Sequence, residues 1–265
     1  MVKPVDLYSS AYRNFEERVL TEVRQEIYGK DIGQNSWITA DEYDQFYSWL
    51  NLAPRAHVLE VASGSGGPSL YLAHKFGCQI TGIDINQHGI ETANKAAKAA
   101  EATNVTYRFA DAEKTLPFED ESFDAIMCMD SMNHFHDRFA VFREWQRVLR
   151  PGGRIVFTDP VVITGPVSNA ELAERSSIGF FIFMPVGWTV NYLKLAGFHL
   201  IKREDVTANI ELTSGRRYTA RAKHREALIK IEGEELFEDS QKFASIVHKL
   251  TSERRLSRIV FLAGK

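Results

Sequence analysis

The chain has 265 residues, of which 44% are hydrophobic and 25% are charged, and its formal net charge is -3. These values are ordinary for a soluble globular protein and exclude a fibrous or extensively disordered chain. The small negative charge gives no general electrostatic reason for binding nucleic acid or an anionic membrane. No apolar run reaches the ~20 residues needed to cross a bilayer, and the first residues lack the apolar core of a secretory signal. We therefore expect a cytoplasmic protein without nucleic-acid or membrane partners.

Cysteine and histidine usage gives no sign of a disulfide framework or a metal centre. Cys78 and Cys128 lie far apart in sequence and provide neither a disulfide framework nor a zinc-ligand cluster. His134 and His136 form an HxH pair, but no adjacent cysteine or paired acid completes a set of three or four ligands. We therefore expect no metal ion.

The first 55 residues are predicted to form a helical cap. Four apolar side chains recur at steps of four and predict one helix over residues 12–28. These side chains are Phe15, Val19, Val23 and Ile27. A second helix is expected after Thr39, whose hydroxyl can cap the turn that carries Asp41 and Glu42.

Residues 56–160 alternate between short apolar runs and helical stretches. The expected strands are HVLEVA, QITGIDI, VTYRFA, FDAIMCM and RIVFTDP. Strands that alternate with helices predict parallel βαβ units, an open sheet with helices on both faces, and ligand binding beyond the carboxyl ends of the strands.

Residues 161–265 have a looser pattern. FHLIKRED and RLSRIVFLA are expected to be the sixth and seventh strands, with helical stretches around residues 220–231 and 240–250 between them. Because no repeat or flexible linker separates these segments from the core, we treat residues 1–265 as a single domain.

The stretch VLEVASGSGG runs from a strand into a loop of small residues. Gly64 and Gly66 begin a GxGxxG pattern, but its third small position falls on Ser69, which weakens the dinucleotide interpretation. A glycine pattern alone does not distinguish a dinucleotide from another nucleotide-like ligand.

Three acids lie at the ends of three successive strands. Glu60 lies just before the glycine-rich loop, Asp84 ends the second strand, and Asp111 follows the third. A carboxylate at Asp84 can accept two hydrogen bonds from ribose hydroxyls, and Asp111 can accept one from an adenine amino group.

Taken together, these motifs resemble those of class I S-adenosylmethionine-dependent methyltransferases. VLEVASGSGG resembles the first motif, with Ala62 where the family usually has glycine. GIDI resembles the ribose motif, FADAEKTLPFEDESFDAI the adenine motif and the following strand, and LRPGGRIVFTDP the turn and fifth strand. The resemblance implies S-adenosylmethionine as cofactor and S-adenosylhomocysteine as product. The cofactor-binding residues that it implies are Glu60, Ala62, Gly64, Gly66, Asp84, Ile85, Asp111, Ala112 and Asp130.

The same resemblance implies an α/β fold of the Rossmann-like type. We expect a seven-stranded, mostly parallel sheet with an antiparallel last strand, a helical N-terminal cap and a helical insertion before the last strand. Residues 1–55 would be the cap, 56–160 the cofactor-binding core, and 161–265 the substrate-cap elements with the last two strands.

SGSGG, MDSMNH and FTDP further resemble small-molecule N-methyltransferases of the phosphoethanolamine and sarcosine/dimethylglycine type. His134 resembles the catalytic histidine of the phosphoethanolamine enzymes, which work with an N-terminal tyrosine, and Tyr12 is the sequence candidate for that tyrosine. A histidine is a natural general base. The alternative for His134 is a loop histidine that hydrogen-bonds backbone. Asp130 is interpreted either as a ligand contact or as a turn cap.

Aromatic residues in the N-terminal loop and late segment are candidates for the walls of an acceptor pocket. They are Trp37, Phe180, Phe181, Phe183 and Trp188. Aromatic faces suit a cationic amine, but core packing is the simpler interpretation for each residue. Tyr218 and the arginines at 216, 217 and 221 can bind an anionic group on the acceptor or begin a solvated helix.

The expected function is methyl transfer from S-adenosylmethionine to a small-molecule acceptor, with an amine nitrogen as the first candidate. The alternatives are an O- or C-methyltransferase of a lipid or secondary metabolite, a non-catalytic cofactor-binding protein on the same fold, and a nicotinamide dehydrogenase. The identity of the acceptor, the number of transfers and the oligomeric state do not follow from the sequence.

Overall fold

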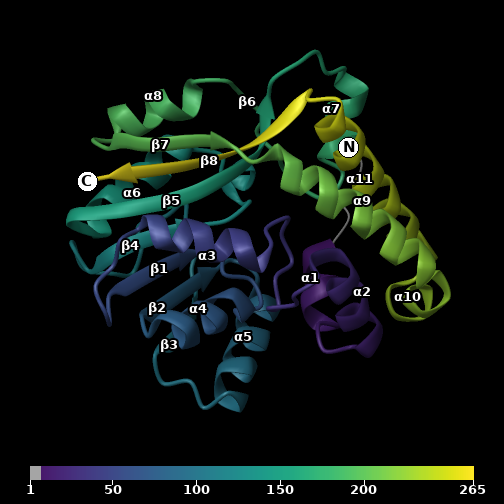
Figure 1. The fold of residues 1–265 in the computed structure, drawn as a ribbon, viewed down its shortest axis with the longest axis horizontal. Coiled ribbons are helices and arrows are strands. Elements are labelled where there is room, and N and C mark those ends of the chain that lie inside the picture. The colour runs from purple at the N-terminus through teal and green to yellow at the C-terminus, as the bar shows by residue number, and fades with distance from the viewer. Residues whose placement is uncertain (1–6) are drawn as a thin grey trace.

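The computed structural model describes residues 7–265, which form an α/β fold around one mixed sheet (Figure 1). The main strands follow the order β3-β2-β1-β4-β5-β8-β7, and a short strand, β6, pairs with β5. The strands are β1 (His57–Val61), β2 (Gln79–Asp84), β3 (Val105–Phe109), β4 (Phe123–Cys128), β5 (Leu149–Ile163), β6 (Met184–Pro185), β7 (His199–Asp205) and β8 (Leu256–Gly264). The predicted seven-stranded sheet is confirmed, with β6 as an addition.

The pairing directions explain where a ligand can bind. β1 pairs in parallel with β2 and β4, β2 with β3, and β4 with β5, whereas β8 runs antiparallel between β5 and β7. The carboxyl ends of the first five strands therefore meet at one edge of the sheet. The LRPGG segment belongs to β5 itself, where the register shifts and Gly152 takes a φ of 78°.

Helices cover both faces of the sheet and one end of it. The core and N-terminal helices are α1 (Leu7–Arg13), α2 (Arg18–Tyr28), α3 (Ala40–Trp49), α4 (Gly67–Phe76), α5 (Gln87–Ala99), η1 (Met132–His134) and α6 (Arg138–Val148). The later helices are α7 (Asn169–Arg175), α8 (Trp188–Leu195), α9 (Thr207–Lys223), α10 (Arg225–Glu232) and α11 (Glu234–Ser252). None of these helices is both long and apolar enough to span a bilayer.

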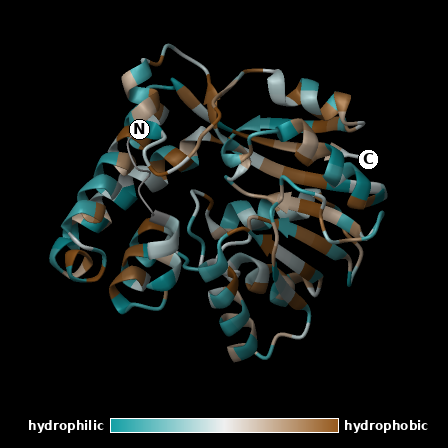
Figure 2. Ribbon diagram, turned by 180° about the vertical axis from the view of Figure 1, so that it is seen from behind, coloured by the Kyte–Doolittle hydropathy of each residue, from teal (hydrophilic) through white to brown (hydrophobic). Residues whose placement is uncertain are grey.

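Two apolar cores lie on opposite faces of the sheet. One contains Phe142 and Trp145 of α6 and Leu193 of α8, and the other contains Phe46 of α3 and Leu72 of α4. The strands between them are mostly buried and hydrophobic (Figure 2). Continuous apolar strands are expected for a parallel sheet with both faces covered.

The N-terminal cap differs from the prediction in one respect. The single helix expected over residues 12–28 is wrong, because residues 14–17 separate α1 from α2. Phe15 lies in this break, where the Arg24 guanidinium lies 4.1 Å from its ring centroid and donates to its carbonyl oxygen over 3.0 Å. The helix expected after Thr39 is confirmed, since the Thr39 hydroxyl accepts from the backbone amide of Glu42.

The late insertion folds into three helices rather than the two predicted stretches. His224 separates α9 from α10, and Gly233, with a φ of 84°, separates α10 from α11. Val23 and Ile27 of α2 pack with Ala220 of α9 and Leu228 of α10 in a small separate core. The N-terminal helix α2 and the late insertion helices thus form one helical cap beside the sheet (Figure 1).

We predict that Gly67→Ala destabilises the protein. A Cβ at Gly67 would lie 2.7 Å from the Gly33 Cα and closer still to the carbonyl oxygen of Ile32. Overpacking against backbone costs about 1–3 kcal/mol, which urea unfolding measures as a lower midpoint. The matched control is Gly179→Ala, because nothing lies within 4 Å of that added Cβ. Equal midpoints for the two variants would contradict the close approach of the N-terminal loop to α4.

Candidate active site

A cavity of about 440 Å³ lies at the carboxyl edge of the sheet, beneath the helical cap. Its walls come from α1, α2 and the loop before α3, from the carboxyl ends of β1, β2, β3 and β4, and from α9 to α11. The predicted site residues that line it are Tyr12, Trp37, Glu60, Ala62, Gly64, Asp84, Ile85, Asp111, Ala112, Asp130 and His134. Residues far apart in sequence therefore share one enclosed space.

The loop after β1 is a tight cradle. Its backbone takes positive φ at Ala62 (60°), Gly64 (54°) and Gly66 (74°). Ala62 thus keeps the left-handed conformation that favours glycine, at a cost of about 1 kcal/mol. Gly66 does not line the cavity; it precedes α4, and its carbonyl oxygen accepts from the Tyr107 hydroxyl at 2.7 Å.

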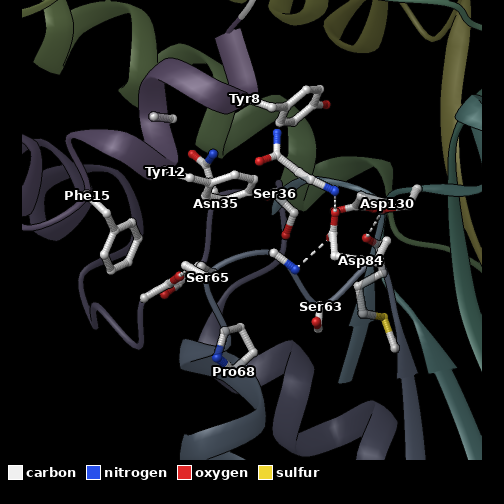
Figure 3. A pocket seen from close by; sticks show the side chains of 18 of the residues that line it. Tyr8, Tyr12, Phe15, Asn35, Ser36, Ser63, Ser65, Pro68, Asp84 and Asp130 are labelled. Carbon is white, nitrogen blue, oxygen red and sulfur yellow. Dashed lines mark hydrogen bonds between the residues drawn. The ribbon is translucent and has the colours of Figure 1, made fainter. Parts of the chain in front are cut away.

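Asp84 ties this loop to the end of β2. Its two carboxylate oxygens accept from the backbone amides of Gly64 at 2.8 Å and Asn86 at 2.7 Å (Figure 3). The Ile85 amide also hydrogen-bonds this carboxylate, and because a carboxylate has about four acceptor positions, part of its acceptor capacity remains for a ligand. Asp111 accepts from the amide of Glu113 at 2.9 Å and also retains free acceptor positions. The two acids can therefore bind hydroxyl or amino donors.

Glu60 is buried below the loop. Burial raises the pKa of its carboxyl from 4.5 to about 7, although a hydrogen bond from the Ser69 hydroxyl opposes the shift. Its carboxyl group lines the cavity at the end of β1. A bound cation would find a negative partner here once the proton is released.

Tyr12 lies over the cradle rather than beside His134. An added Cβ at Gly64 would lie 2.5 Å from the Tyr12 hydroxyl oxygen, so this position requires glycine. The hydroxyl hydrogen-bonds the Asn35 side chain, and burial, followed by the charge of Asp84, raises its pKa well above the usual value. In Figure 3, Tyr12 and Asn35 close the side of the cavity that faces Ser65.

The partner of His134 is Tyr8, one helical turn before Tyr12 on α1. The Tyr8 hydroxyl oxygen lies 3.2 Å from His134 Nε2, and His134 Nδ1 lies 3.2 Å from the carbonyl oxygen of Phe180. Because a carbonyl only accepts, Nδ1 carries the proton and Nε2 accepts from Tyr8. Burial lowers the pKa of His134 to about 4 and raises that of Tyr8 to about 12, so both are neutral near pH 7.

Asp130 has a structural role that sequence alone did not distinguish. Its carboxylate accepts from Arg258 Nε at 2.6 Å, from the Thr158 hydroxyl at 2.7 Å and from the backbone amide of Trp37 at 3.0 Å. Arg258 is completely buried and also donates to both oxygens of Glu42. Asp130 thus places Trp37 in the cavity wall, and its charge is compensated within the fold.

Three predicted substrate residues do not line the cavity, and the expectation for them is corrected. Trp188 is half-exposed on α8 beside Tyr192, because that helix packs against α6 on a face of the sheet. Tyr218 is half-exposed on α9. The Phe180 side chain stacks on His136 at 3.9 Å, and only its carbonyl reaches His134.

The HxH pair is divided between two environments. His136 Nδ1 lies 2.9 Å from a Glu113 oxygen, while His134 faces Tyr8. Within residues 7–265, no group of three or more His, Cys, Asp or Glu side chains is arranged to hold a metal ion.

Two contributions to the site were missed from sequence. Tyr8 was missed because Tyr8 and Tyr12 lie four residues apart on the same helix, and the sequence pattern did not show which of them faces His134. The two rings stack with centroids 6.5 Å apart. Arg258 was missed because it lies within the apolar strand RLSRIVFLA. The signal that could have revealed it was a charged residue inside a strand that is otherwise apolar.

Residues 59–157 match the family model described as a methyltransferase domain. This part of the chain is a methyltransferase domain, as the motifs predicted. A 27-O-demethylrifamycin SV methyltransferase from Amycolatopsis mediterranei is 32% identical over 168 residues, which cover 62% of this chain and 61% of the relative. A sarcosine/dimethylglycine N-methyltransferase from Halorhodospira halochloris is 36% identical over 110 residues, which cover 42% of this chain and 39% of the relative.

The matched stretches therefore span less than two thirds of these curated relatives. A solved structure, the phosphoethanolamine N-methyltransferase 2 of Haemonchus contortus in complex with phosphomonomethylethanolamine and S-adenosylhomocysteine, superimposes with a TM-score of 0.81 at 19% identity. The superposition covers 98% of this chain and 60% of that chain, which shows a shared fold.

We predict that Glu60 makes stability depend on pH. Its raised folded pKa of about 7 means that the folded protein keeps a proton that the unfolded chain releases above about 4.5. Stability therefore falls as pH rises from 4.5 to 7, by about 2–3 kcal/mol. Glu60→Gln keeps an acceptor for the Ser69 hydroxyl and should remove this dependence of the unfolding free energy on pH, measured by urea unfolding at pH 5 to 8. The exposed Glu119→Gln is the charge-matched control, and equal slopes in all three proteins would contradict the burial effect.

Proposed function

We propose that the protein transfers a methyl group from S-adenosylmethionine to a small-molecule acceptor. The observation that carries the proposal is the convergence of two sets of groups on one cavity. The glycine-rich cradle with Asp84 and Asp111 forms one side, and the Tyr8–His134 pair forms another. The methyltransferase domain over residues 59–157 and the named relatives support the same reaction class.

The residues of the cradle fit the proposed methyl donor. The free acceptor positions of Asp84 suit ribose hydroxyls, and those of Asp111 suit an adenine amino group. Ile85 is 63% exposed within the cavity wall and offers an apolar surface to a base. Glu60 and the turn from Ala62 to Gly64 would then bind the methionyl end of the donor. In this turn the Ser63 hydroxyl oxygen is buried without a hydrogen-bond partner.

The bound donor would supply an electrophilic methyl group on a sulfonium, and the chain's own residues would position and deprotonate the acceptor. An ammonium or hydroxyl acceptor must lose a proton. The Tyr8 hydroxyl can take up that proton while it passes its own to His134 Nε2, which is neutral at pH 7. The same pair serves nitrogen and oxygen acceptors.

An amine nitrogen is our first candidate for the methylated atom, because the motifs resemble those of N-methyltransferases. The rifamycin relative, named for a 27-O-demethyl substrate, keeps O-methylation as the second candidate. A cytoplasmic location and the absence of nucleic-acid partners remain predictions.

The reaction is tested by incubating the protein with labelled S-adenosylmethionine and a panel of amines, phenols and carboxylic acids, with mass-spectrometric detection. Methylated amines support the first candidate, and methylated phenols alone support the second. If S-adenosylhomocysteine binds and no acceptor is methylated, a non-catalytic role replaces the proposal. If NAD, and not S-adenosylhomocysteine, raises the melting temperature, a dehydrogenase replaces it.

Asp84→Ala should weaken S-adenosylhomocysteine binding by about 1–3 kcal/mol, the usual loss when hydrogen bonds to a charged group are removed. The variant loses both the ligand acceptors and the bond to the Gly64 amide. Asp84→Asn keeps one acceptor oxygen, so its S-adenosylhomocysteine affinity in calorimetry should lie between those of Asp84→Ala and the wild type. Wild-type affinity in both variants would contradict the assignment of Asp84 to the ribose.

Tyr8→Phe should lower kcat by about 10²-fold with S-adenosylhomocysteine affinity within twofold, because the hydroxyl acts on the proton and not on the donor. Tyr12→Phe, one turn along α1, is the matched control and should change mainly donor affinity, since its hydroxyl lies over Gly64. His134→Ala should lower kcat similarly. The double variant Tyr8→Phe/His134→Ala should lose no more than either single variant, as expected for a pair acting as a unit. Multiplying losses would contradict a shared proton path.

A further inference from the structure

The cavity extends beyond the cradle into an inner lobe between α2 and the insertion helices. The walls of this inner lobe include Leu20, Val23 and Ile27 of α2, Ile231 of α10 and Phe243 of α11. Val23 and Ile27 are buried, at 4% and 3% exposure. The same part of the wall also carries Arg217, Arg221 and Glu232, so the inner lobe combines apolar side chains with charged groups, and a small hydrophilic amine would leave its apolar part unfilled.

Arg217 of α9 places a cation in the wall of this lobe. Its Nη2 donates to the Tyr28 hydroxyl at 2.7 Å and to the Ser36 carbonyl at 2.9 Å, and its guanidinium lies 4.4 Å from the centroid of the Trp37 ring. Its Nε is buried without a hydrogen-bond partner. Among residues 7–265, no carboxylate lies within ion-pair distance of Arg217. One turn further along α9, Arg221 differs because it is paired with Glu232.

A second cation without a described counter-ion lies nearby. Arg175 is 1% exposed, with its guanidinium 5.0 Å from the Phe181 ring centroid and 5.1 Å from that of Phe243. Its Nη1 has no hydrogen-bond partner, and no carboxylate of the described residues is within ion-pair distance. The charges of Arg175 and Arg217 both act on the Tyr8 hydroxyl, so they lie on the acceptor side of the cavity.

A cation removed from water without a paired anion is costly, and the two acids whose charges act on Arg175, Asp130 and Asp159, are bound to other arginines. Desolvating a charge costs several kcal/mol unless an opposite charge and hydrogen bonds compensate it. The carboxylate of Asp130 is already shared by Arg258, Thr158 and the Trp37 amide. An anion brought by the ligand would supply the missing compensation at the Arg217 guanidinium, because Arg217 lines the cavity.

We infer that the methyl acceptor is an amphipathic anion, with a hydrocarbon or aromatic body that fills the inner lobe and a carboxylate or phosphate that binds at Arg217. The inference rests on the proposed function and specifies its substrate class. An acceptor that carries only a positive charge does not fit this combination of apolar walls and unpaired guanidinium groups.

The test is calorimetry of the S-adenosylhomocysteine-saturated protein with three probe series: n-alkyl phosphates, n-alkyl carboxylates and n-alkylammonium ions, each with chains of two, four and six carbons. We expect an anionic series to bind tighter by about fourfold for each added methylene until the lobe is full. Whichever anion binds tighter identifies the head group. Affinity that is independent of chain length, or an ammonium series that binds as tightly, would overturn the inference.

Variants locate the binding. Val23→Phe fills the inner lobe from α2 and should abolish the gain with chain length, whereas Val19→Phe, one turn earlier and outside the cavity wall, should not. Ser240→Leu fills the inner lobe from α11, and it is used in place of Val23→Phe if the Val23→Phe protein does not fold. Arg217→Met should weaken the anionic series at least tenfold, and the neighbouring exposed Arg216→Met should not. Unchanged binding in all filling and charge variants would refute this site.

Separate readouts distinguish the inference from the proposed function. S-adenosylhomocysteine affinity is measured first, in the wild type and every variant, and reports the donor site. If the donor does not bind, the proposed function fails, and titration of the protein alone with the alkyl phosphates still tests the inner lobe.

Discussion

The buried contact between Asp130 and Arg258 is the constraint on which the acceptor side of the site depends. Asp130 follows β4 in a left-handed conformation, with a φ of 56°, and its carboxylate accepts from β5, β8 and the loop before α3. Arg258 extends the network to Glu42 of α3. Removing one member of such a network leaves a buried charge without a partner, which typically costs 3–5 kcal/mol. The site is therefore built into the fold rather than added to its surface.

The two sides of the cavity are constructed differently. The donor side consists of turns at the carboxyl ends of adjacent parallel strands, where Gly64 and Asp84 are fixed by backbone hydrogen bonds. The acceptor side is assembled from α1, α2 and the late insertion, which pack on one another away from the sheet. In the proposed reaction the cradle would hold the donor and the cap would determine the acceptor, as in other folds where function depends on sites carried by a scaffold.

Charge on the acceptor side is unevenly balanced. Arg258, Arg138 and Arg221 have buried acidic partners, namely Asp130, Asp159 and Glu232. Arg175 and Arg217 have none among the described residues, although both act on the Tyr8 hydroxyl. The three other buried arginines are paired with acids, so Arg175 and Arg217 point to the chemistry of a ligand.

The sequence by itself determined the succession of strands along the chain, the cradle and its acids, because these depend on local patterns: alternating apolar runs, small residues in a tight turn, and carboxylates at strand ends. It also located His134 near the end of β4. It did not separate Tyr8 from Tyr12, since both occupy one helix and only the packing of α1 against His134 distinguishes them. Nor did it show that Trp188 and Tyr218 lie outside the cavity wall, or that Arg258 compensates Asp130. Those results depend on contacts between separate segments, more than a hundred residues apart for Tyr8 with His134 and for Asp130 with Arg258, which local spacing does not encode and only the tertiary structure decided.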